Sequence, residues 1–321
     1  MNQIVDSAIQ SYMEKYKISQ GVCCVMRGEE ILVQSGFGVD KNTIFRIASI
    51  TKFFTRVGII QLIEQGRLSL DTQAFPLIDL QPLAGEEFNP DLNKITVQQL
   101  LDHQGGWDSQ VIGEVTFQRP VITKAVNKPE EQVTPEDMVK YMLSKPLQFE
   151  PGTKKSYSGF GYSVLGRVIE KVSGLNYGDY IKTQLTGPLS LYSIQLGHTS
   201  KDQALPNEAN YEKDSGTNSN EDPYKFLCLE MADSAGGLIS SSLDLCKFLN
   251  HYWGNGQPRH QQTGHNFHMN GRSVGTLALA LQRKDGINVA VMFNNRHNRD
   301  NNKDQELQDL IEKAVDRLLA I

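Results

Sequence analysis

Both ends of the chain carry the same pattern, an amphipathic helix beside a β-hairpin, and this pattern constrains the fold more than any other feature. Near the N-terminus, the apolar runs 22–26 and 31–34 flank a glycine-containing turn. Near the C-terminus, the apolar runs 276–281 and 287–292 flank a second such turn. The helical stripes cover residues 4–16 and 307–318. Four apolar strands and two amphipathic helices are most simply buried in one antiparallel sheet built from both ends, with the helices against its faces.

The middle of the chain is typical of helices and loops rather than strands. Thr96 with Gln99, and Thr134 before a proline, are common helix starts. A third apolar stripe, over residues 162–172, ends at Gly174. We therefore predict that the 321 residues form a single unit with two parts. The predicted α/β part comprises residues 1–70 and 230–321, and the mostly helical part comprises residues 71–229.

The composition argues against several classes of function. The formal net charge of −5 and the lack of a Lys/Arg cluster among aromatic residues provide no surface for nucleic acid. No apolar run is long enough to span a membrane, and the first residues do not resemble a secretory signal peptide. We expect a cytoplasmic protein by default, with export without a cleavable signal left open. The cysteines lack metal-binding spacing and are expected to be reduced core residues, namely Cys23, Cys24, Cys228 and Cys246.

Ser49 and Lys52 form the single Ser-x-x-Lys sequence of the chain, directly before an apolar helical stripe. A serine at the start of a helix lies near free backbone N–H groups that favour negative charge, and residues three apart share a face. Lys52 is therefore expected against the Ser49 hydroxyl, where an amine can take up the hydroxyl proton. Taken alone, the motif also fits a helix start that carries this spacing by chance.

A second segment of the sequence supports a catalytic interpretation of Ser49 and Lys52. Tyr157-Ser158-Gly159 lies between a Pro-Gly pair and a long apolar helical stripe. This block resembles the Tyr-Ser-Asn block of class C β-lactamases, D-alanyl-D-alanine carboxypeptidases and related esterases, a family that is similar to the penicillin-binding proteins. The other segments that resemble the same family, in the same order along the chain, are residues 45–52, 95–106, 234–241 and 264–271.

The resemblance implies a fold and a set of catalytic roles. The implied fold is of the α/β (α+β) class and β-lactamase/transpeptidase-like, with an antiparallel five-stranded sheet flanked by the terminal helices and a mostly helical insertion. The implied roles make Ser49 the acylated nucleophile, Lys52 its proton partner and Tyr157 the group that relays a proton to or from the leaving group. Either Lys52 or Tyr157 can be the base, and the sequence leaves this choice open.

The third motif of the family, Lys-Thr-Gly or His-x-Gly, lies on the sheet edge that faces the nucleophile. We match it to the triplet that begins at His265 and ends at Phe267. His265 then acts as a catalytic hydrogen-bonding or cationic group, and the backbone N–H of His268 joins the oxyanion hole. Phe267 stands where the family has glycine, and Gly159 stands where the family has an asparagine that binds a substrate amide. Residues 262–264 are an alternative match.

We predict a serine hydrolase that acts through an acyl-enzyme on a small ester or amide, with Gly159, Phe267 and His268 at the substrate. The changed residues favour an ester over a β-lactam or a peptidyl-D-alanine. One alternative is a D-alanyl-D-alanine carboxypeptidase or β-lactamase, and another is a non-catalytic binding or scaffold protein with this fold. The histidines and cysteines match no metal-site pattern, so we expect neither a metal nor an organic cofactor. The oligomeric state is left open.

Overall fold

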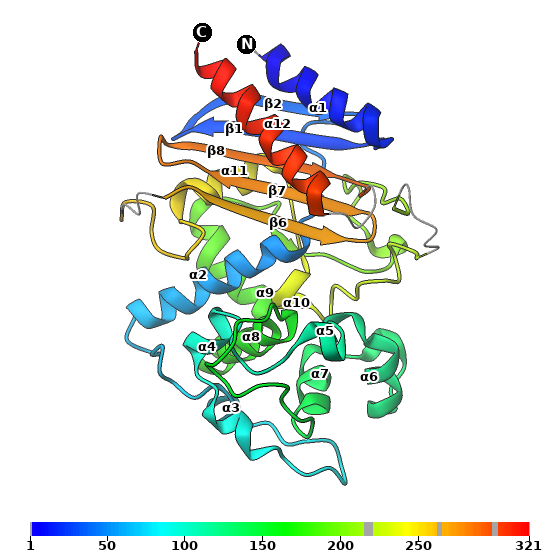
Figure 1. The fold of residues 1–321 in the computed structure, drawn as a ribbon, viewed down its shortest axis with the longest axis vertical. Helices are drawn as coiled ribbons and strands as arrows, with labels where there is room; N and C mark the ends of the chain where they lie inside the picture. Colours follow the sequence, from blue (N-terminus) through cyan, green and yellow to red (C-terminus); the bar gives the residue numbers. More distant parts are fainter. Residues whose placement is uncertain (1, 215–220, 262–264, 297–300, 321) are drawn as a thin grey trace.

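The two ends of the chain build one five-stranded antiparallel sheet, as the sequence predicted (Figure 1). The computed structural model describes residues 2–214, 221–261, 265–296 and 301–320. The strand order is β2-β1-β8-β7-β6, so the N-terminal and C-terminal hairpins meet where β1 pairs with β8. The strands are β1 (Gly21–Arg27), β2 (Glu30–Phe37), β6 (Phe267–Ser273), β7 (Thr276–Gln282) and β8 (Ile287–Phe293).

The terminal helices α1 (Asn2–Tyr16) and α12 (Asn301–Leu319) lie against one face of this sheet (Figure 1). Ile9 of α1 and Ile311 of α12 are fully buried there, and the Tyr12 ring stacks on Phe293 of β8 with 5.7 Å between the ring centroids. Each fully buried isoleucine contributes about 1.5–3 kcal/mol of hydrophobic stabilisation. The predicted packing of the terminal helices against the sheet is confirmed, with both helices on the same face rather than one on each.

The other face of the sheet carries smaller side chains and packs against α11 (Ser242–His251). Ala278, Ala280 and Ala290 belong to this face, and small residues let α11 approach the strands closely. Helix α2 (Thr51–Glu64) packs in turn on α11, where the Phe54 ring stacks on Phe248 with 4.1 Å between the ring centroids. The nucleophile predicted from the sequence lies directly before α2. The sheet therefore serves as the rigid support for the start of that helix.

The remaining helices form most of the lower part of the molecule in Figure 1. They are α3 (Ala74–Ile78), α4 (Val97–Leu101), α5 (Ser109–Ile112), α6 (Arg119–Val126), α7 (Pro135–Met142), α8 (Gly159–Ser173), α9 (Tyr177–Tyr180) and α10 (Asp233–Gly236). Helix α8 is the predicted apolar stripe, capped at its start by Ser158 and ended by Gly174 at φ +79°. The division of the chain at residues 70 and 230 stays a prediction.

A small second sheet, which the sequence did not predict, fixes the segment before Ser49. It has the order β3-β5-β4 and comprises β3 (Phe45–Arg46), β4 (Gln195–Leu196) and β5 (Leu238–Ser240). Arg46 is buried, its Nη1 donates to the Pro223 carbonyl oxygen at 2.6 Å, and its backbone N–H donates to the Tyr211 hydroxyl at 2.7 Å. These bonds hold β3 firmly, three residues before Ser49.

Three further features bear on the expectations from the sequence. The four cysteines are buried and form no disulfide. Among the described residues, no three His, Cys, Asp or Glu side chains are grouped so that they could hold a metal ion. No described helix combines the length and the apolar character that crossing a lipid bilayer requires.

Candidate active site

The chain turns sharply between β3 and α2, and Ser49 lies at this turn. Ala48 has a left-handed backbone conformation with φ +43°, which costs a non-glycine residue roughly 1–2 kcal/mol. One 3₁₀ turn over Ala48–Ile50 then leads into α2. The N–H of Leu238 in β5 donates to the Thr51 Oγ1 at 3.1 Å and ties the start of the helix to the small sheet. Ser49 is thus held at the start of a buried helix, as the sequence predicted, with this single turn in between.

Strand β6 can pass close to this turn because Gly271 has no side chain. A Cβ atom at Gly271 would collide with the carbonyl oxygen of Ile47, two residues before Ser49. β6 is an edge strand, so half of its backbone N–H and C=O groups face away from the sheet. The glycine therefore brings this free edge next to the Ser49 turn.

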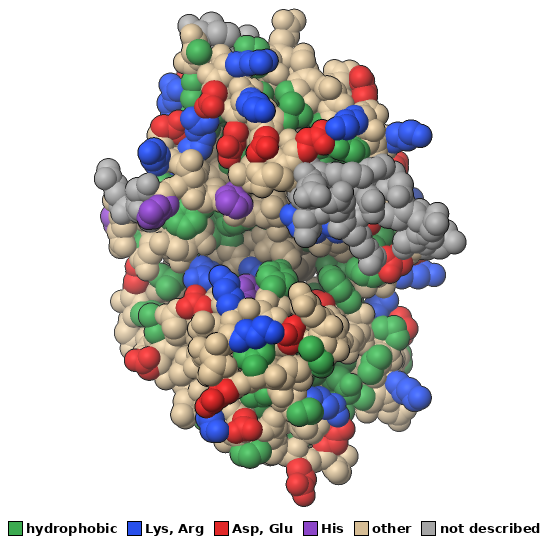
Figure 2. Space-filling model, viewed as in Figure 1, with side chains coloured by type: hydrophobic (Ala, Val, Ile, Leu, Met, Phe, Trp, Pro, Cys, Tyr) green, Lys and Arg blue, Asp and Glu red, His purple; other side chains and the backbone are tan. Residues whose placement is uncertain are grey.

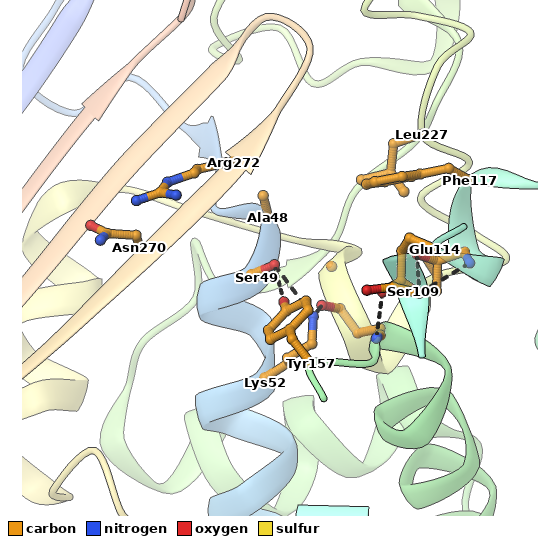
Figure 3. A pocket seen from close by; sticks show the side chains of 15 residues that line it. Ala48, Ser49, Lys52, Ser109, Glu114, Phe117, Tyr157, Leu227, Asn270 and Arg272 are labelled. Carbon is orange, nitrogen blue, oxygen red and sulfur yellow. Dashed lines mark hydrogen bonds between the residues drawn. The ribbon is translucent and has the colours of Figure 1, made fainter. Parts of the chain in front are cut away.

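Three side chains meet beside the turn (Figure 3). Ser49 Oγ lies 2.7 Å from the hydroxyl oxygen of Tyr157, and Lys52 Nζ donates to Ser49 Oγ at 3.3 Å. Lys52 is buried, and its Nζ also donates to the Ala235 carbonyl oxygen at 2.6 Å and lies 5.0 Å from the centre of the Tyr157 ring. The structure therefore brings together Ser49, Lys52 and Tyr157, which lie in two segments far apart in the sequence.

His103 holds Tyr157 in position. The centroids of the two rings are 4.7 Å apart. The backbone N–H of Ser158 donates to Nδ1 of His103 at 3.2 Å, and the N–H of Ser156 donates to its carbonyl oxygen at 2.9 Å. Both chain neighbours of Tyr157 are therefore bonded to one residue, and the ring of that residue packs on the tyrosine.

The His103 imidazole is neutral at neutral pH. Burial, together with the nearby positive charges of Lys52 and Arg56, lowers the pKa of His103 from 6.5 to about 3. A neutral ring can accept the Ser158 N–H through Nδ1, which a charged ring cannot do. His103 lies within the segment 95–106, but nothing in the local spacing indicates its contacts with the tyrosine segment.

Replacing His103 with asparagine is expected to make the fold less sensitive to acid. Asparagine tolerates the left-handed backbone of this position, φ +59°, and offers an oxygen to the Ser158 N–H. Because the folded-state pKa of His103 is depressed, its contribution to stability is fully present above about pH 6.5. That contribution falls by at most about 1.4 kcal/mol per pH unit as the pH decreases towards 3.

Urea unfolding of the wild type and His103→Asn at about pH 7 and about pH 4.5 measures this effect. The other histidines titrate in both proteins, so the difference between the two pH-dependent losses belongs to position 103. We expect the wild type to lose more stability than the variant. Equal losses would contradict the described environment of His103.

The three side chains border a cavity of about 560 Å³. Figure 2 shows the surface hollowed between the sheet part and the helical part, and Figure 3 shows the residues inside. Phe117 and Leu227 form an apolar wall, whereas Glu114, Asn270 and Arg272 contribute polar groups. A cavity of this size, largely apolar with a few polar groups, is typical of sites for small organic molecules.

Comparison with known proteins decides the family. The model of the family described as Beta-lactamase matches residues 5–313, nearly the whole chain. The chain belongs to the β-lactamase family.

Penicillin-binding protein 4* of Bacillus subtilis is 29% identical over 205 residues, which are 57% of this chain and 39% of that protein. Protein flp of Staphylococcus aureus strain MW2 is 27% identical over 215 residues, which are 63% of this chain and 40% of that protein. The chain thus matches about two fifths of the length of these relatives.

Solved structures of the same fold extend over almost the whole chain. A D-stereospecific amidohydrolase from Streptomyces sp. has 22% identity and a TM-score of 0.73, and the match covers 94% of this chain and 97% of that one. The D-amino acid amidase from Ochrobactrum anthropi SV3 has 20% identity and a TM-score of 0.73, with coverages of 98% and 99%. These likenesses show the β-lactamase/transpeptidase-like fold that the sequence predicted.

The structure does not bring the predicted third-motif residues of the β-lactamase family to the cavity. His265 and His268 are exposed, and neither they nor Phe267 are among the described residues that line it. Phe267 instead packs on Trp253, with 5.7 Å between the ring centroids. The strand position against the Ser49 turn is Gly271, four residues after Phe267, because only a glycine fits beneath the Ile47 carbonyl oxygen.

We infer that the motif corresponds in space to the triplet from Met269 to Gly271. Asn270 and Arg272, on either side of the glycine, line the cavity. Met269 then stands where the family has lysine or histidine. The alternative match at residues 262–264 lies outside the described residues.

Gly159 lines the cavity, and the space beside it is filled by a residue that sequence reasoning missed. The Gly159 N–H donates to Oε2 of Glu114 at 2.9 Å. A Cβ atom at Gly159 would lie 2.9 Å from Oε1 of Glu114 and 3.1 Å from Oγ1 of Thr116. Glu114 thus takes up the room that the asparagine of the family motif would need. No local pattern could have indicated this contact, since 45 positions separate the two residues.

Proposed function

We propose that the protein is a serine hydrolase that cleaves a small ester or amide through an acyl-Ser49 intermediate. The observation that carries the proposal is the pair of contacts at Ser49 Oγ, 3.3 Å to Lys52 Nζ and 2.7 Å to the Tyr157 hydroxyl, beside a cavity of about 560 Å³. A serine becomes a good nucleophile when an adjacent group can take its proton. Membership of the β-lactamase family supports the same class of reaction.

In the first half of the proposed reaction, the Ser49 proton passes to Lys52 as a free amine or to Tyr157 as a phenolate, while Oγ bonds to the carbonyl carbon of the substrate. The carbonyl oxygen becomes an oxyanion. The proton then goes to the departing alcohol or amine as its bond to carbon breaks, which leaves an ester on Ser49. In the second half, water loses a proton to the same group and attacks this ester, and the acid departs as Ser49 regains its proton. No step uses a metal or an organic cofactor.

Two backbone N–H groups are suited to stabilise the oxyanion. The Ser49 N–H lies at the start of the helical segment, where the helix dipole favours negative charge. Ser273 pairs with Thr276 across a two-residue turn, so the N–H of the neighbouring Arg272 points away from β7. We infer that Arg272, which borders the cavity, supplies the second donor in place of His268.

Two features bear on the kind of substrate. The likeness to a D-amino acid amidase and a D-stereospecific amidohydrolase supports an amide or ester of a small acid. The match to penicillin-binding protein 4* favours a second candidate, a D-alanyl-D-alanine carboxypeptidase or β-lactamase. Gly159 lacks the amide that family members offer to such substrates, and Glu114 fills its place. We therefore favour the first candidate.

A panel of four substrates tests the proposal. It comprises a short-chain aryl ester, phenylalanine amide in both configurations, a chromogenic cephalosporin and a D-alanyl-D-alanine peptide. We expect Ser49-dependent product release from the ester or the amide. Faster release from the cephalosporin or the peptide would establish the second candidate. Release from none of them would favour the non-catalytic alternative.

Tyr157→Phe is expected to lower kcat for an amide by about 10²–10⁴-fold. Phenylalanine keeps a ring against His103 and removes only the hydroxyl that faces Ser49 Oγ. A nitrophenyl ester has a leaving group that departs without protonation, so comparing it with the amide separates the two possible roles of the tyrosine. A loss confined to the amide assigns Tyr157 to the leaving group, and an equal loss on both assigns it to the Ser49 proton. Unchanged kcat on both would contradict either role.

A further inference from the structure

The carboxylate of Glu114 is held at the cavity wall in a fixed position (Figure 3). Its Oε2 accepts the Gly159 N–H at 2.9 Å, and its Oε1 accepts the Thr116 N–H at 3.4 Å and the Thr116 hydroxyl at 3.3 Å. Gly159 is the first residue of α8, so the carboxylate lies at the positive end of that helix dipole. Glu114 is therefore preorganised by groups on two separate segments.

This carboxylate has acceptor capacity left over. Two carboxylate oxygens offer about four acceptor positions, of which three are in use. Within the described part of the chain, no lysine, arginine or histidine nitrogen forms an ion pair with Glu114. The negative charge thus borders the cavity without a cationic partner from those residues.

The chemistry of a carboxylate differs from that of the asparagine it displaces. An asparagine amide both donates and accepts, and it suits a neutral substrate amide, whereas an ionised carboxylate only accepts. It favours a positively charged donor, and a charge-assisted hydrogen bond is roughly twice as strong as a neutral one. An anionic group at the same position would be repelled.

We propose that Glu114 binds the ammonium group of the substrate, so that the preferred substrates are esters or amides of an amino acid with a free amino group. This inference rests on the proposed function, hydrolysis through an acyl-Ser49 intermediate, and it specifies the acyl group of the substrate. Phe117 and Leu227 line the same cavity and provide an apolar surface for the side chain of that acyl group. The carbonyl carbon then lies at Ser49 and the ammonium group at the end of the cavity that Glu114 borders.

The test compares Glu114→Gln with the wild type on two methyl esters that differ in one group. Phenylalanine methyl ester, in both configurations, carries the ammonium group, and methyl 3-phenylpropanoate lacks it. Glutamine keeps the length of the side chain and an oxygen for the Gly159 N–H but loses the charge. We expect kcat/KM for the amino ester to fall about 10–100-fold in the variant, with less than about a 3-fold change for the desamino ester. Glu87→Gln, an exposed glutamate outside the cavity, is the matched control.

The pH dependence supplies a second readout. An α-amino group titrates near pH 8, roughly, so wild-type kcat/KM for the amino ester should decline above that pH relative to the desamino ester. In Glu114→Gln, kcat/KM for the amino ester should show no such decline relative to the desamino ester. An equal loss on both esters would show that Glu114 only supports the fold and would overturn the inference. Ser49-dependent cleavage of the desamino ester with no preference for the amino ester would overturn it while leaving the proposed hydrolase function intact. Cleavage of neither ester by the wild type would overturn both.

Discussion

Ser49→Ala is expected to reduce turnover of every substrate that the wild type cleaves by at least about 10³-fold. The substitution removes the atom that attacks the carbonyl carbon, and the remaining groups can then only polarise the substrate. Lys52 keeps its bond to the Ala235 carbonyl oxygen in this variant, so its buried amino group retains a partner. The fold should therefore persist, and kcat/KM measured beside the thermal unfolding midpoint separates loss of chemistry from loss of structure.

Ser11→Ala is the matched control for this experiment. Ser11 is an exposed serine on α1, and it is not among the residues that line the cavity. The Ser11→Ala variant should have the same kcat/KM as the wild type. Turnover that survives in Ser49→Ala would assign the hydrolysis to another group and would remove the basis for the acyl-enzyme.

Lys52→Met is expected to lower kcat by about 10²–10⁴-fold, the range typical of a lost proton-transfer group. Methionine has a similar length and no charge, so it fills the buried site, where Lys52 is 9% exposed. The Tyr157 hydroxyl remains 2.7 Å from Ser49 Oγ in the unaltered geometry, but the cation beside it is gone. Both proton routes from Ser49 are thereby weakened.

The measurement is kcat for the substrate that the wild type cleaves best, followed over pH 5–10, roughly the range in which activated amines and phenols titrate. Lys41→Met, at an exposed lysine outside the cavity, is the control and should behave as the wild type. A Lys52→Met enzyme with wild-type kcat would exclude Lys52 from the proton transfer and leave Tyr157 as the base. A large loss at all pH values supports the proposed role.

Much of the fold was predictable because its signals are local. The two hairpins show as apolar runs around glycine turns, and the helix from Gly159 to Ser173 shows as an apolar stripe that Gly174 ends. The spacing of Ser49 and Lys52 likewise places the two side chains within one helical turn of each other. The structure contains the contact between Lys52 Nζ and Ser49 Oγ that this spacing predicts. The sheet built from both ends followed from the need to bury these elements together.

The remaining features depend on contacts between distant segments. The strands β3 and β4 contain two residues each, too few to show an alternating pattern, so the second sheet left no trace in the sequence. The position of the third motif depended on which residue of β6 meets the Ser49 turn, and steric fit at Gly271 decides it. His103 and Glu114 act through residues that lie 55 and 45 positions away along the chain.

The central claim is that Ser49 becomes acylated, and the intact mass of the protein tests it most directly. Wild type and Ser49→Ala are mixed briefly with a nitrophenyl ester and, separately, with a penicillin, and nitrophenol release is followed in parallel. We expect a mass increase equal to the acyl group of the ester, or nitrophenol release when deacylation is fast, in the wild type and not in the variant. An adduct that also forms in Ser49→Ala, or neither adduct nor nitrophenol from the wild type, would contradict it.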